Sequence, residues 1–243
     1  MKLNFKILVF ILMMIYIAIL YIPININYKK FKFIKKMCLN VGSFLGIKPM
    51  ACWNVIKNIY LLIIGGIPLT YCFYKGFVKV YNIYTETNII KSIMAIVLSF
   101  IGVLEISFFI IIVIVSYLMK KDSRKEMSQV SWIKFNKDKP FYTGIIKPII
   151  YALFEVVLYY YLMFYILNDY LKLSFMLSII SIAILYSISK LVLVRNKEQA
   201  LIYGTWSFSL NFIGSCVLIY TNSITPTFIL YLLYSFLICF KEG

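Results

Sequence analysis

The stretch 151-YALFEVVLYYYLMF-164 is apolar and aromatic throughout except for one carboxylate, Glu155. Its composition predicts the middle of a helix that crosses a membrane, because a bilayer requires about 20 predominantly apolar residues. A charged group near the centre of such a helix costs at least about 2.5 kcal/mol on insertion scales. The position of Glu155 therefore indicates either a buried partner or a function.

The rest of the chain has the composition of an integral membrane protein. Of its 243 residues, 63% are hydrophobic and 14% are charged, whereas soluble domains average about 25% charged residues. The formal net charge is +16. The Lys and Arg residues lie in short stretches between apolar runs, where the positive-inside rule and anionic head groups account for them. We therefore expect these basic residues to contact the lipid bilayer, and we expect no nucleic-acid partner.

The apolar runs predict an all-α fold, a polytopic transmembrane helical bundle of about seven spans. The runs lie at 3–27, 57–75, 89–119, 144–167, 173–195, 200–220 and 225–241. The first run is too long for the apolar part of a signal peptide, and no small-residue cleavage site follows it. The second run is interrupted by 65-GGIP-68, so its bounds are the least defined.

A hydrophilic loop divides the chain into three regions. An N-terminal three-span region occupies 1–119, the basic loop occupies 120–143, and a group of four spans occupies 144–243. The loop and the segment after the first span carry seven basic residues each, which predicts a cytoplasmic C-terminus in a bacterial plasma membrane. The stretch 28-YKKFKFIKKM-37 either lies on the anionic inner leaflet or serves as an orientation signal.

The sequence contains no histidine. This excludes His-based acid–base catalysis, Ser–His and Cys–His nucleophiles, and imidazole metal ligands. None of the five cysteines forms a CxxC pair, so we expect buried free thiols. We also expect no metal site and no cofactor.

Three ionisable residues fall inside predicted spans: Glu105, Glu155 and Lys190. Such groups usually face the interior of a bundle. Lys190 lies near the cytoplasmic end of its span, so its ammonium group either turns inward or extends to the head groups. We predict that Lys190 and Glu155 interact, directly or through a tyrosine or a water; otherwise Glu155 is protonated and hydrogen-bonded. The candidate intramembrane polar site comprises Glu105, Glu155, Tyr159, Tyr160, Tyr186 and Lys190.

Three segments of the last four spans carry a family resemblance: 154-FEVVLYY-160, 186-YSISK-190 and 222-NSITPTFILYLLYSF-236. They resemble the CPBP family of intramembrane CAAX proteases and bacteriocin-processing (Abi) proteins. Members of that family carry Glu-Glu-x-x-x-Arg, Phe-x-x-x-His and His-x-x-x-Asn motifs on separate helices. Glu155 matches the first glutamate, and Tyr186 is an acceptable aromatic residue at the start of the second motif.

The other signature positions depart from the family pattern. Val156 replaces the second glutamate, Tyr160 the arginine, and Lys190 the first histidine; Leu230 and Tyr234 stand in place of the last histidine and asparagine. The resemblance covers about residues 144–238 and rests mainly on spacing, hydropathy and aromatic placement. In active members a metal-bound water is thought to cleave the peptide. The resemblance therefore implies a degenerate member that lacks the metal site, with Glu155 as a remnant of the catalytic carboxylate; a purely structural hydrogen-bond network is the alternative.

The resemblance implies a non-catalytic CPBP-like membrane protein, a pseudoenzyme. It would act in bacteriocin or peptide self-immunity, processing or export support, by binding a small peptide or membrane protein through a cavity lined by aromatic residues, Glu155 and Lys190. The alternative is a permease subunit of a peptide or small-molecule transporter, in which Glu105, Glu155 and Lys190 line a path. The third possibility is a CAAX-type intramembrane protease with unrecognised chemistry.

Overall fold

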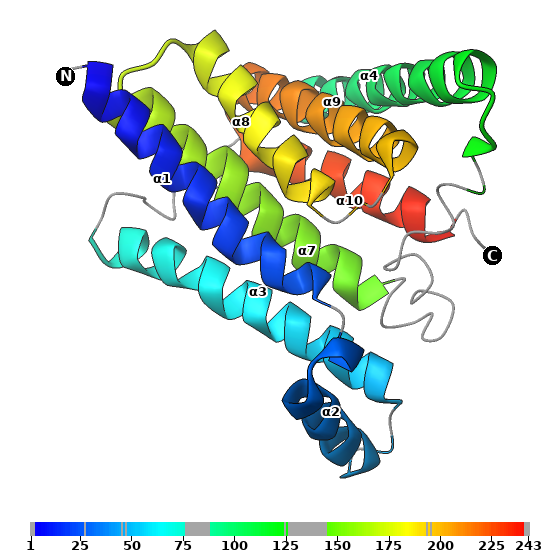
Figure 1. The fold of residues 1–243 in the computed structure, drawn as a ribbon. Helices are drawn as coiled ribbons and strands as arrows, with labels where there is room; N and C mark the ends of the chain where they lie inside the picture. The colour runs from blue at the N-terminus through cyan, green and yellow to red at the C-terminus, as the bar shows by residue number, and fades with distance from the viewer. Residues whose placement is uncertain are drawn as a thin grey trace. The chain divides into compact units, whose positions relative to one another are not determined.

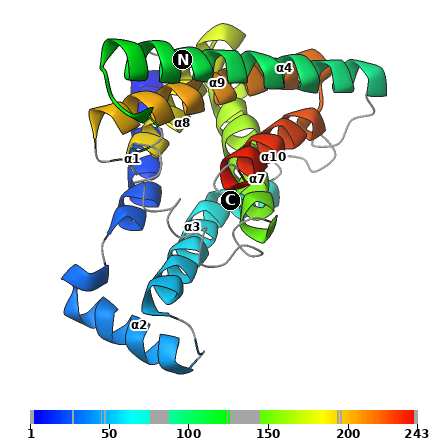
Figure 2. The same cartoon turned by 90° about the vertical axis from the view of Figure 1, so that its right-hand side faces the viewer.

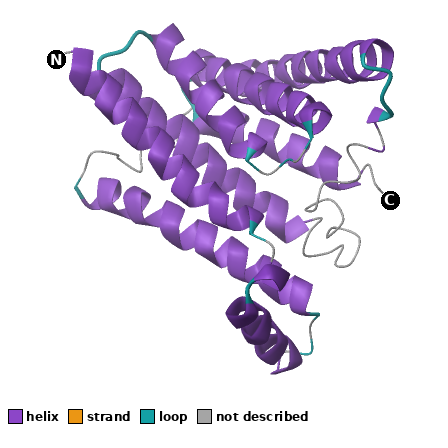
Figure 3. Ribbon diagram, in the orientation of Figure 1, coloured by secondary structure: helices purple, strands orange, loops and turns teal. Residues whose placement is uncertain are grey.

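The structure, a computed structural model, describes residues 3–26, 28–44, 46, 48–75, 88–123, 125, 145–192, 194 and 196–240. Within these ranges the regular elements are all helices (Figure 3). The predicted all-α fold class is thus confirmed. The chain divides into two compact units, residues 2–71 and 72–243, and each unit is described by itself.

The N-terminal unit contains the helices α1 (Leu3–Tyr21) and α2 (Lys32–Phe44) and nearly all of α3 (Pro49–Tyr74). Two short 3₁₀ turns, η1 (Ile22–Asn25) and η2 (Tyr28–Lys30), lie between α1 and α2. Hydrogen bonds from α3 fix it to α1 and to the turn that follows. The Tyr60 hydroxyl donates to the Ile19 carbonyl oxygen at 2.6 Å, and the Trp53 indole N–H donates to the Ile26 carbonyl oxygen at 3.0 Å.

Helix α3 runs without a break through 65-GGIP-68, where the sequence predicts an interruption. Pro68 lacks an N–H and cannot donate to the carbonyl oxygen of Ile64 four residues earlier. The Tyr16 hydroxyl of α1 lies 3.3 Å from that oxygen and donates to it. A neighbouring helix thus satisfies the carbonyl group that the proline leaves without a helical partner, as apolar surroundings require.

The basic stretch 28–37 falls on η2 and the first half of α2. At 13 residues α2 is too short to cross a bilayer. Cys38 and Gly42 are buried on one side of it, whereas the rings of Phe33 and Phe44 are exposed. This pattern of exposed rings among lysines suits a helix that lies at a membrane surface.

Besides the end of α3, five helical segments make up the described part of the C-terminal unit. Their bounds are α4 (Ile89–Phe109) continued by the π-helical η4 (Ile110–Leu118), α7 (Lys147–Glu155) continued by the π-helical η6 (Val156–Met163) and η7 (Ile166–Tyr170), α8 (Phe175–Leu191), α9 (Lys197–Thr221) and α10 (Ile224–Phe240). Helix α9 is the centre of the unit and packs against α8, α4 and α10 (Figures 1 and 2). Helix α10 also packs against α7 and η6. The third predicted span, α4, therefore belongs with the four-span group.

Small side chains allow α8 and α9 to approach closely. A Cβ atom added at Gly204 of α9 would lie 2.9 Å from Leu191 Cδ2 of α8. The Ser187 hydroxyl of α8 donates to the Gly204 carbonyl oxygen at 2.8 Å. Small residues and interhelical hydroxyl bonds of this kind hold helices together where lipid removes the hydrophobic driving force.

Among the residues that the structure describes, five helical segments are long and apolar enough to cross a membrane. They are Asn4–Tyr21, Cys52–Tyr74, Ile89–Leu118, Pro148–Tyr170 and Lys197–Thr221. Phe175–Leu191 and Ile224–Phe236 are apolar but shorter. These lengths support a membrane protein, and the count of seven spans stays a prediction. Residues 126–143 of the predicted basic loop and the C-terminal residues 241–243 lie outside the described residues.

Candidate functional site

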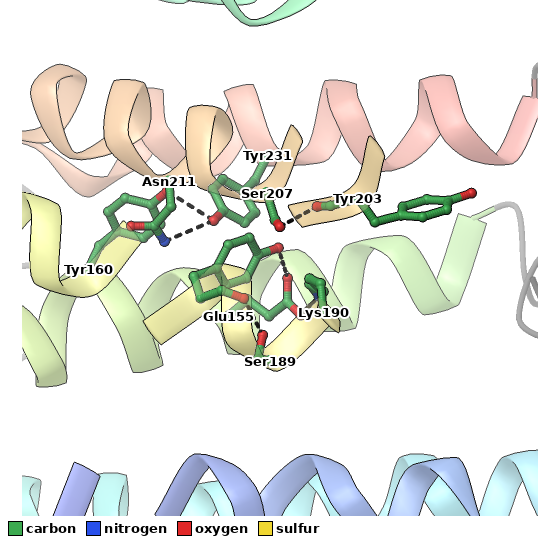
Figure 4. Close-up of polar contacts among 9 residues, drawn as sticks. Glu155, Tyr160, Ser189, Lys190, Tyr203, Ser207, Asn211 and Tyr231 are labelled. Atoms are coloured by element: carbon green, nitrogen blue, oxygen red, sulfur yellow. Dashed lines mark hydrogen bonds and ion pairs between the residues drawn. The ribbon is translucent and has the colours of Figure 1, made fainter. Parts of the chain in front are cut away.

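Glu155 is the last residue of α7 and is 5% exposed. Both of its carboxylate oxygens are engaged. The Tyr186 hydroxyl donates to Oε2 at 2.7 Å, and the Lys190 ammonium group forms an ion pair with Oε1 (Figure 4). The predicted interaction between Glu155 and Lys190 is confirmed, and of the two alternatives it is the direct one. The carboxylate accepts from two donors.

Lys190 and Tyr186 come from one face of α8, four residues apart. The Lys190 ammonium lies 4.8 Å from the centroid of the Tyr186 ring, a geometry in which the ring quadrupole adds to the attraction of the carboxylate. Lys190 therefore turns into the bundle rather than out to the head groups. Its side chain keeps 18% exposure, so the pair sits at the edge of the buried region.

The direct contact bridges a difference in depth along the two helices. Counted from the cytoplasmic ends of the predicted spans, Glu155 would lie about 16 Å deep and Lys190 about 7 Å deep. Since the two groups meet, the long stem of Lys190 is directed inward and closes this gap.

A second set of polar contacts lies beside the ion pair. The Tyr160 hydroxyl is 2.9 Å from the Tyr231 hydroxyl and 3.3 Å from the Leu210 carbonyl oxygen, and Asn211 Nδ2 donates to the Tyr231 hydroxyl at 3.2 Å (Figure 4). Each hydroxyl carries one proton. The arrangement that satisfies all three bonds has Asn211 donating to Tyr231, Tyr231 to Tyr160, and Tyr160 to Leu210.

Aromatic contacts join the two sets of polar groups. The Tyr186 ring packs edge-on against Tyr159 with centroids 4.9 Å apart, and against Tyr231 with centroids 5.7 Å apart. Tyr231 in turn packs edge-on against Tyr160 at 5.3 Å. These four tyrosines are each at most 1% exposed. We call the residues Glu155, Tyr159, Tyr160, Tyr186, Lys190, Asn211 and Tyr231 the polar network.

The position of Tyr160 depends on a glycine in α9. A Cβ atom added at Gly214 would lie 2.7 Å from the Tyr160 hydroxyl oxygen and 3.1 Å from its Cζ. The absence of a side chain at Gly214 therefore makes room for the phenol. The Gly214 carbonyl oxygen also accepts a hydrogen bond from the Thr227 hydroxyl of α10 at 3.1 Å.

The structure brings five of the six predicted site residues together and leaves Glu105 apart from them. Glu105 is exposed on α4, where its carboxylate faces the surface of the unit. Its exposure distinguishes Glu105 from the buried side chains of the polar network. The permease interpretation stays a prediction.

Sequence reasoning missed Asn211 and Tyr231. It focused in α10 on Leu230 and Tyr234, which the family pattern places at the last histidine and asparagine. Leu230 is fully buried, and the Tyr234 hydroxyl donates to the Phe100 carbonyl oxygen of α4 at 2.6 Å. One available signal was Asn211 itself, an amide inside an apolar run, because polar groups within a span usually face other polar groups.

A half-open pocket of about 320 Å³ adjoins the polar network where α8 begins and α9 ends. Tyr160 belongs to both, since its ring lines the pocket while its hydroxyl contacts Tyr231. Neither Glu155 nor Lys190 lines this pocket. The expected cavity lined by aromatic residues, Glu155 and Lys190 is therefore not this pocket, and it stays a prediction.

The charge of Glu155 is balanced by a side chain of the same unit. Among the residues that the structure describes, no three His, Cys, Asp or Glu side chains are grouped so as to hold a metal ion. Lys190 occupies the space beside Glu155 where a cation would otherwise sit, and its positive charge opposes a second cation there. The neutralised pair suits a fixed polar anchor between α7 and α8.

Residues 93–242 match DUF5968, which is described as a family of unknown function. The match covers more than half of the chain. The chain belongs to this family. The matched region includes every residue of the polar network and of the pocket, and it begins after the N-terminal unit, inside α4. No curated protein and no solved structure shows a significant match to the chain.

Proposed function

We propose that this protein is a non-catalytic membrane protein that binds a peptide or a partner protein within the bilayer and acts in bacteriocin self-immunity, peptide processing or export support. The observation that supports the proposal is the occupation of both Glu155 oxygens by Lys190 and Tyr186. In the CPBP-like pattern this glutamate would be the catalytic carboxylate. Here its charge is balanced by Lys190.

A general base must come within about 2.6–3.2 Å of the proton that it removes, directly or through one water. The Tyr186 hydroxyl contacts one carboxylate oxygen and the Lys190 ammonium group contacts the other, so a substrate proton would have to approach beside these two donors. The residue that replaces the family's first histidine thus supplies a fixed positive charge instead of a metal ligand. Binding is the function that such a closed site leaves available.

A bound peptide needs a surface to contact, and the pocket beside the polar network offers one. Its walls are aromatic and its volume of about 320 Å³ falls at the lower end of the range for small-ligand sites, about 300–1,000 Å³. The network fixes Tyr160, which forms part of the wall. A rigid wall raises affinity because fewer side chains must be ordered on binding.

The proposal is tested by expressing the chain in a bacterium and measuring survival against a panel of cationic amphipathic pore-forming peptides. We expect survival to rise for at least one peptide and to fall back in Tyr186→Phe, which loosens Glu155 without leaving a charge unpaired. Glu105→Gln is the matched control, since Glu105 lies apart from the network, and it should protect like the unmodified chain. Protein levels in the membrane are compared by immunoblot.

A protease assay provides the opposing outcome. The purified protein is incubated with zinc and a quenched fluorescent peptide library, with and without a chelator. We expect no chelator-sensitive cleavage. Cleavage that a chelator stops and Glu155→Gln abolishes, or a complete lack of protection across the panel together with no peptide cross-linked to the protein, would refute the proposal.

A further inference from the structure

The pocket beside the polar network combines five aromatic rings with one carboxylate. The rings are those of Tyr160, Tyr161, Phe164, Tyr165 and Phe175, and the carboxylate is that of Asp169. Among the described residues that line the pocket, Asp169 is the one that carries a charge. The electrostatic potential of the aromatic rings and of the carboxylate determines which class of ligand the pocket favours.

The faces of aromatic rings carry negative potential and attract cations. A carboxylate at the same site adds a full negative charge, which repels anions and is poorly suited to a purely apolar ligand. Asp169 Oδ1 accepts a hydrogen bond from Asn168 Nδ2 at 2.9 Å, which orients the group. An ionised carboxylate retains further lone pairs for a ligand.

Aromatic residues also gather at membrane interfaces without binding a ligand, so their mere number decides nothing. Contacts within the protein hold three of these lining rings in place. Phe164 and Phe175, from the segment after η6 and from the start of α8, stack with centroids 6.2 Å apart and planes at 27°. Tyr160 is 1% exposed and is held by Tyr231, so it does not face lipid.

We propose that this pocket binds an ammonium group, either a quaternary ammonium or the amine of a lysine side chain. The group would lie against the aromatic walls with Asp169 as its counter-ion. If the ammonium group belongs to a peptide, the pocket is where that peptide docks, and this part of the inference rests on the proposed function. The binding of a cation rests only on the residues that line the pocket.

The test is ligand-observed NMR with the full-length protein in maltoside micelles, which contain no ammonium group. The probe is choline, and its neutral isostere 3,3-dimethyl-1-butanol has the same shape without the charge. We expect choline to bind at millimolar concentration at least tenfold more tightly than the isostere. Asp169→Asn should weaken choline binding at least tenfold, whereas Asp122→Asn, which removes an exposed carboxylate at the end of η4, should leave it unchanged.

Two further probes distinguish the source of the ammonium group. N-acetyl-lysine amide represents a peptide side chain, and glycerophosphocholine represents a lipid head group. Displacement of choline by the lysine amide alone supports a peptide ligand, whereas equal displacement by glycerophosphocholine supports a lipid ligand at the same cation site. Both results agree with the inference.

The inference is overturned if the neutral isostere binds as tightly as choline, or if Asp169→Asn binds choline like the unmodified protein. Because Asp169 is exposed, the substitution should not impair folding, and a matching elution profile on gel filtration confirms that it does not. Failure here leaves the proposed function intact if the survival assay still shows protection. If protection is lost while choline still binds, the proposed function fails and the cation site stands.

Discussion

Glu155 and Lys190, 35 residues apart in the sequence, form a direct ion pair at the boundary between α7 and α8. Removing one partner leaves the other charge buried without compensation, which typically costs about 3–5 kcal/mol. We therefore expect Glu155→Gln and Lys190→Met each to lower stability in detergent. The double variant should lose less than the sum of the two, because it leaves no uncompensated charge.

The measurement is thermal unfolding followed by size-exclusion chromatography. Glu105→Gln serves as the control and should change stability by no more than about 0.5 kcal/mol, as exposed substitutions usually do. Strictly additive losses in the double variant would show that the two residues do not act as a pair. In that case the network would lose its central contact.

The ion pair was predictable because two ionisable groups in neighbouring apolar spans have few other ways to offset their burial. The helical segments were predictable for the same kind of reason, since their apolar runs are long and uninterrupted. The continuity of α3 was not predictable. It depends on a hydrogen bond from Tyr16 of α1. The residues next to Pro68 in the sequence do not indicate this bond.

Asn211, Tyr231 and the pocket also lay beyond sequence reasoning. Tyr231 is one of 21 tyrosines. The rotation of α10 about its axis determines which of its tyrosines faces the network and which faces α4. Tyr234, one turn later, donates to α4 instead. Such choices are set by how helices rotate against each other, and spacing along one chain does not determine that rotation.

Gly214 supplies the second prediction. Gly214→Ala places a methyl group against the Tyr160 hydroxyl oxygen, at 2.7 Å in the present arrangement. Overpacking of this kind costs about 1–3 kcal/mol, partly offset by the better helix propensity of alanine. We expect net destabilisation in a thermal unfolding assay, and partial rescue when Tyr160→Phe removes the hydroxyl.

Gly102→Ala is the matched control for that experiment. Gly102 also lies in a helix, and an added Cβ would meet its nearest neighbour, Ile213 Cδ1, at an ordinary 3.8 Å. The substitution should be neutral or stabilising by up to about 1 kcal/mol. Equal effects of the two alanines would mean that Gly214 has no special role beside Tyr160.

The proline in α3 supplies the third prediction. Tyr16→Phe removes the hydroxyl that donates to the Ile64 carbonyl oxygen, and we expect a loss of about 0.5–1.5 kcal/mol. In a Pro68→Ala background, the new backbone N–H can donate to that same oxygen. Tyr16→Phe should then cost clearly less. The comparison is made by thermal unfolding of the four proteins, and an equal cost in both backgrounds contradicts the compensation.

The Cys38 thiol supplies a prediction about pH. Burial raises the pKa of this thiol above its ordinary value, and the neighbouring Cys52 adds to the effect. The thiolate is the nucleophile, so alkylation of Cys38 at pH 8 should be slower than that of an exposed thiol and should accelerate as pH rises. A folded-state pKa above the unfolded one also means that stability is highest at low pH and declines as pH rises through the folded value.

The experiment uses N-ethylmaleimide and a protein whose other cysteines are replaced by serine. The reference is Ser43→Cys on the same helix, at an exposed position. We expect at least a tenfold slower reaction at Cys38 at pH 8. Equal rates for the two thiols would contradict the burial of Cys38.

The number of membrane crossings can be decided at the short helices. Helix α8 has 17 residues, about 25 Å at 1.5 Å per residue, which is slightly less than the hydrocarbon core of about 30 Å. In the predicted orientation, residue 196 is cytoplasmic and residue 225 is outside if both α8 and α10 cross. If neither crosses, the two positions exchange sides, and the C-terminus keeps its predicted cytoplasmic side in both cases. A tag at Gly243 alone therefore cannot distinguish seven spans from five.

Cysteine labelling at these two positions distinguishes them. Asn196→Cys and Thr225→Cys, both at exposed sites, are each introduced into a cysteine-free protein, with Asp122→Cys as the cytoplasmic reference. Intact cells are treated with a membrane-impermeant maleimide. Seven spans predict labelling of Thr225→Cys in intact cells, and labelling of Asn196→Cys and Asp122→Cys only after the membrane is opened. The reverse pattern at 196 and 225 would mean that α8 and α10 do not cross.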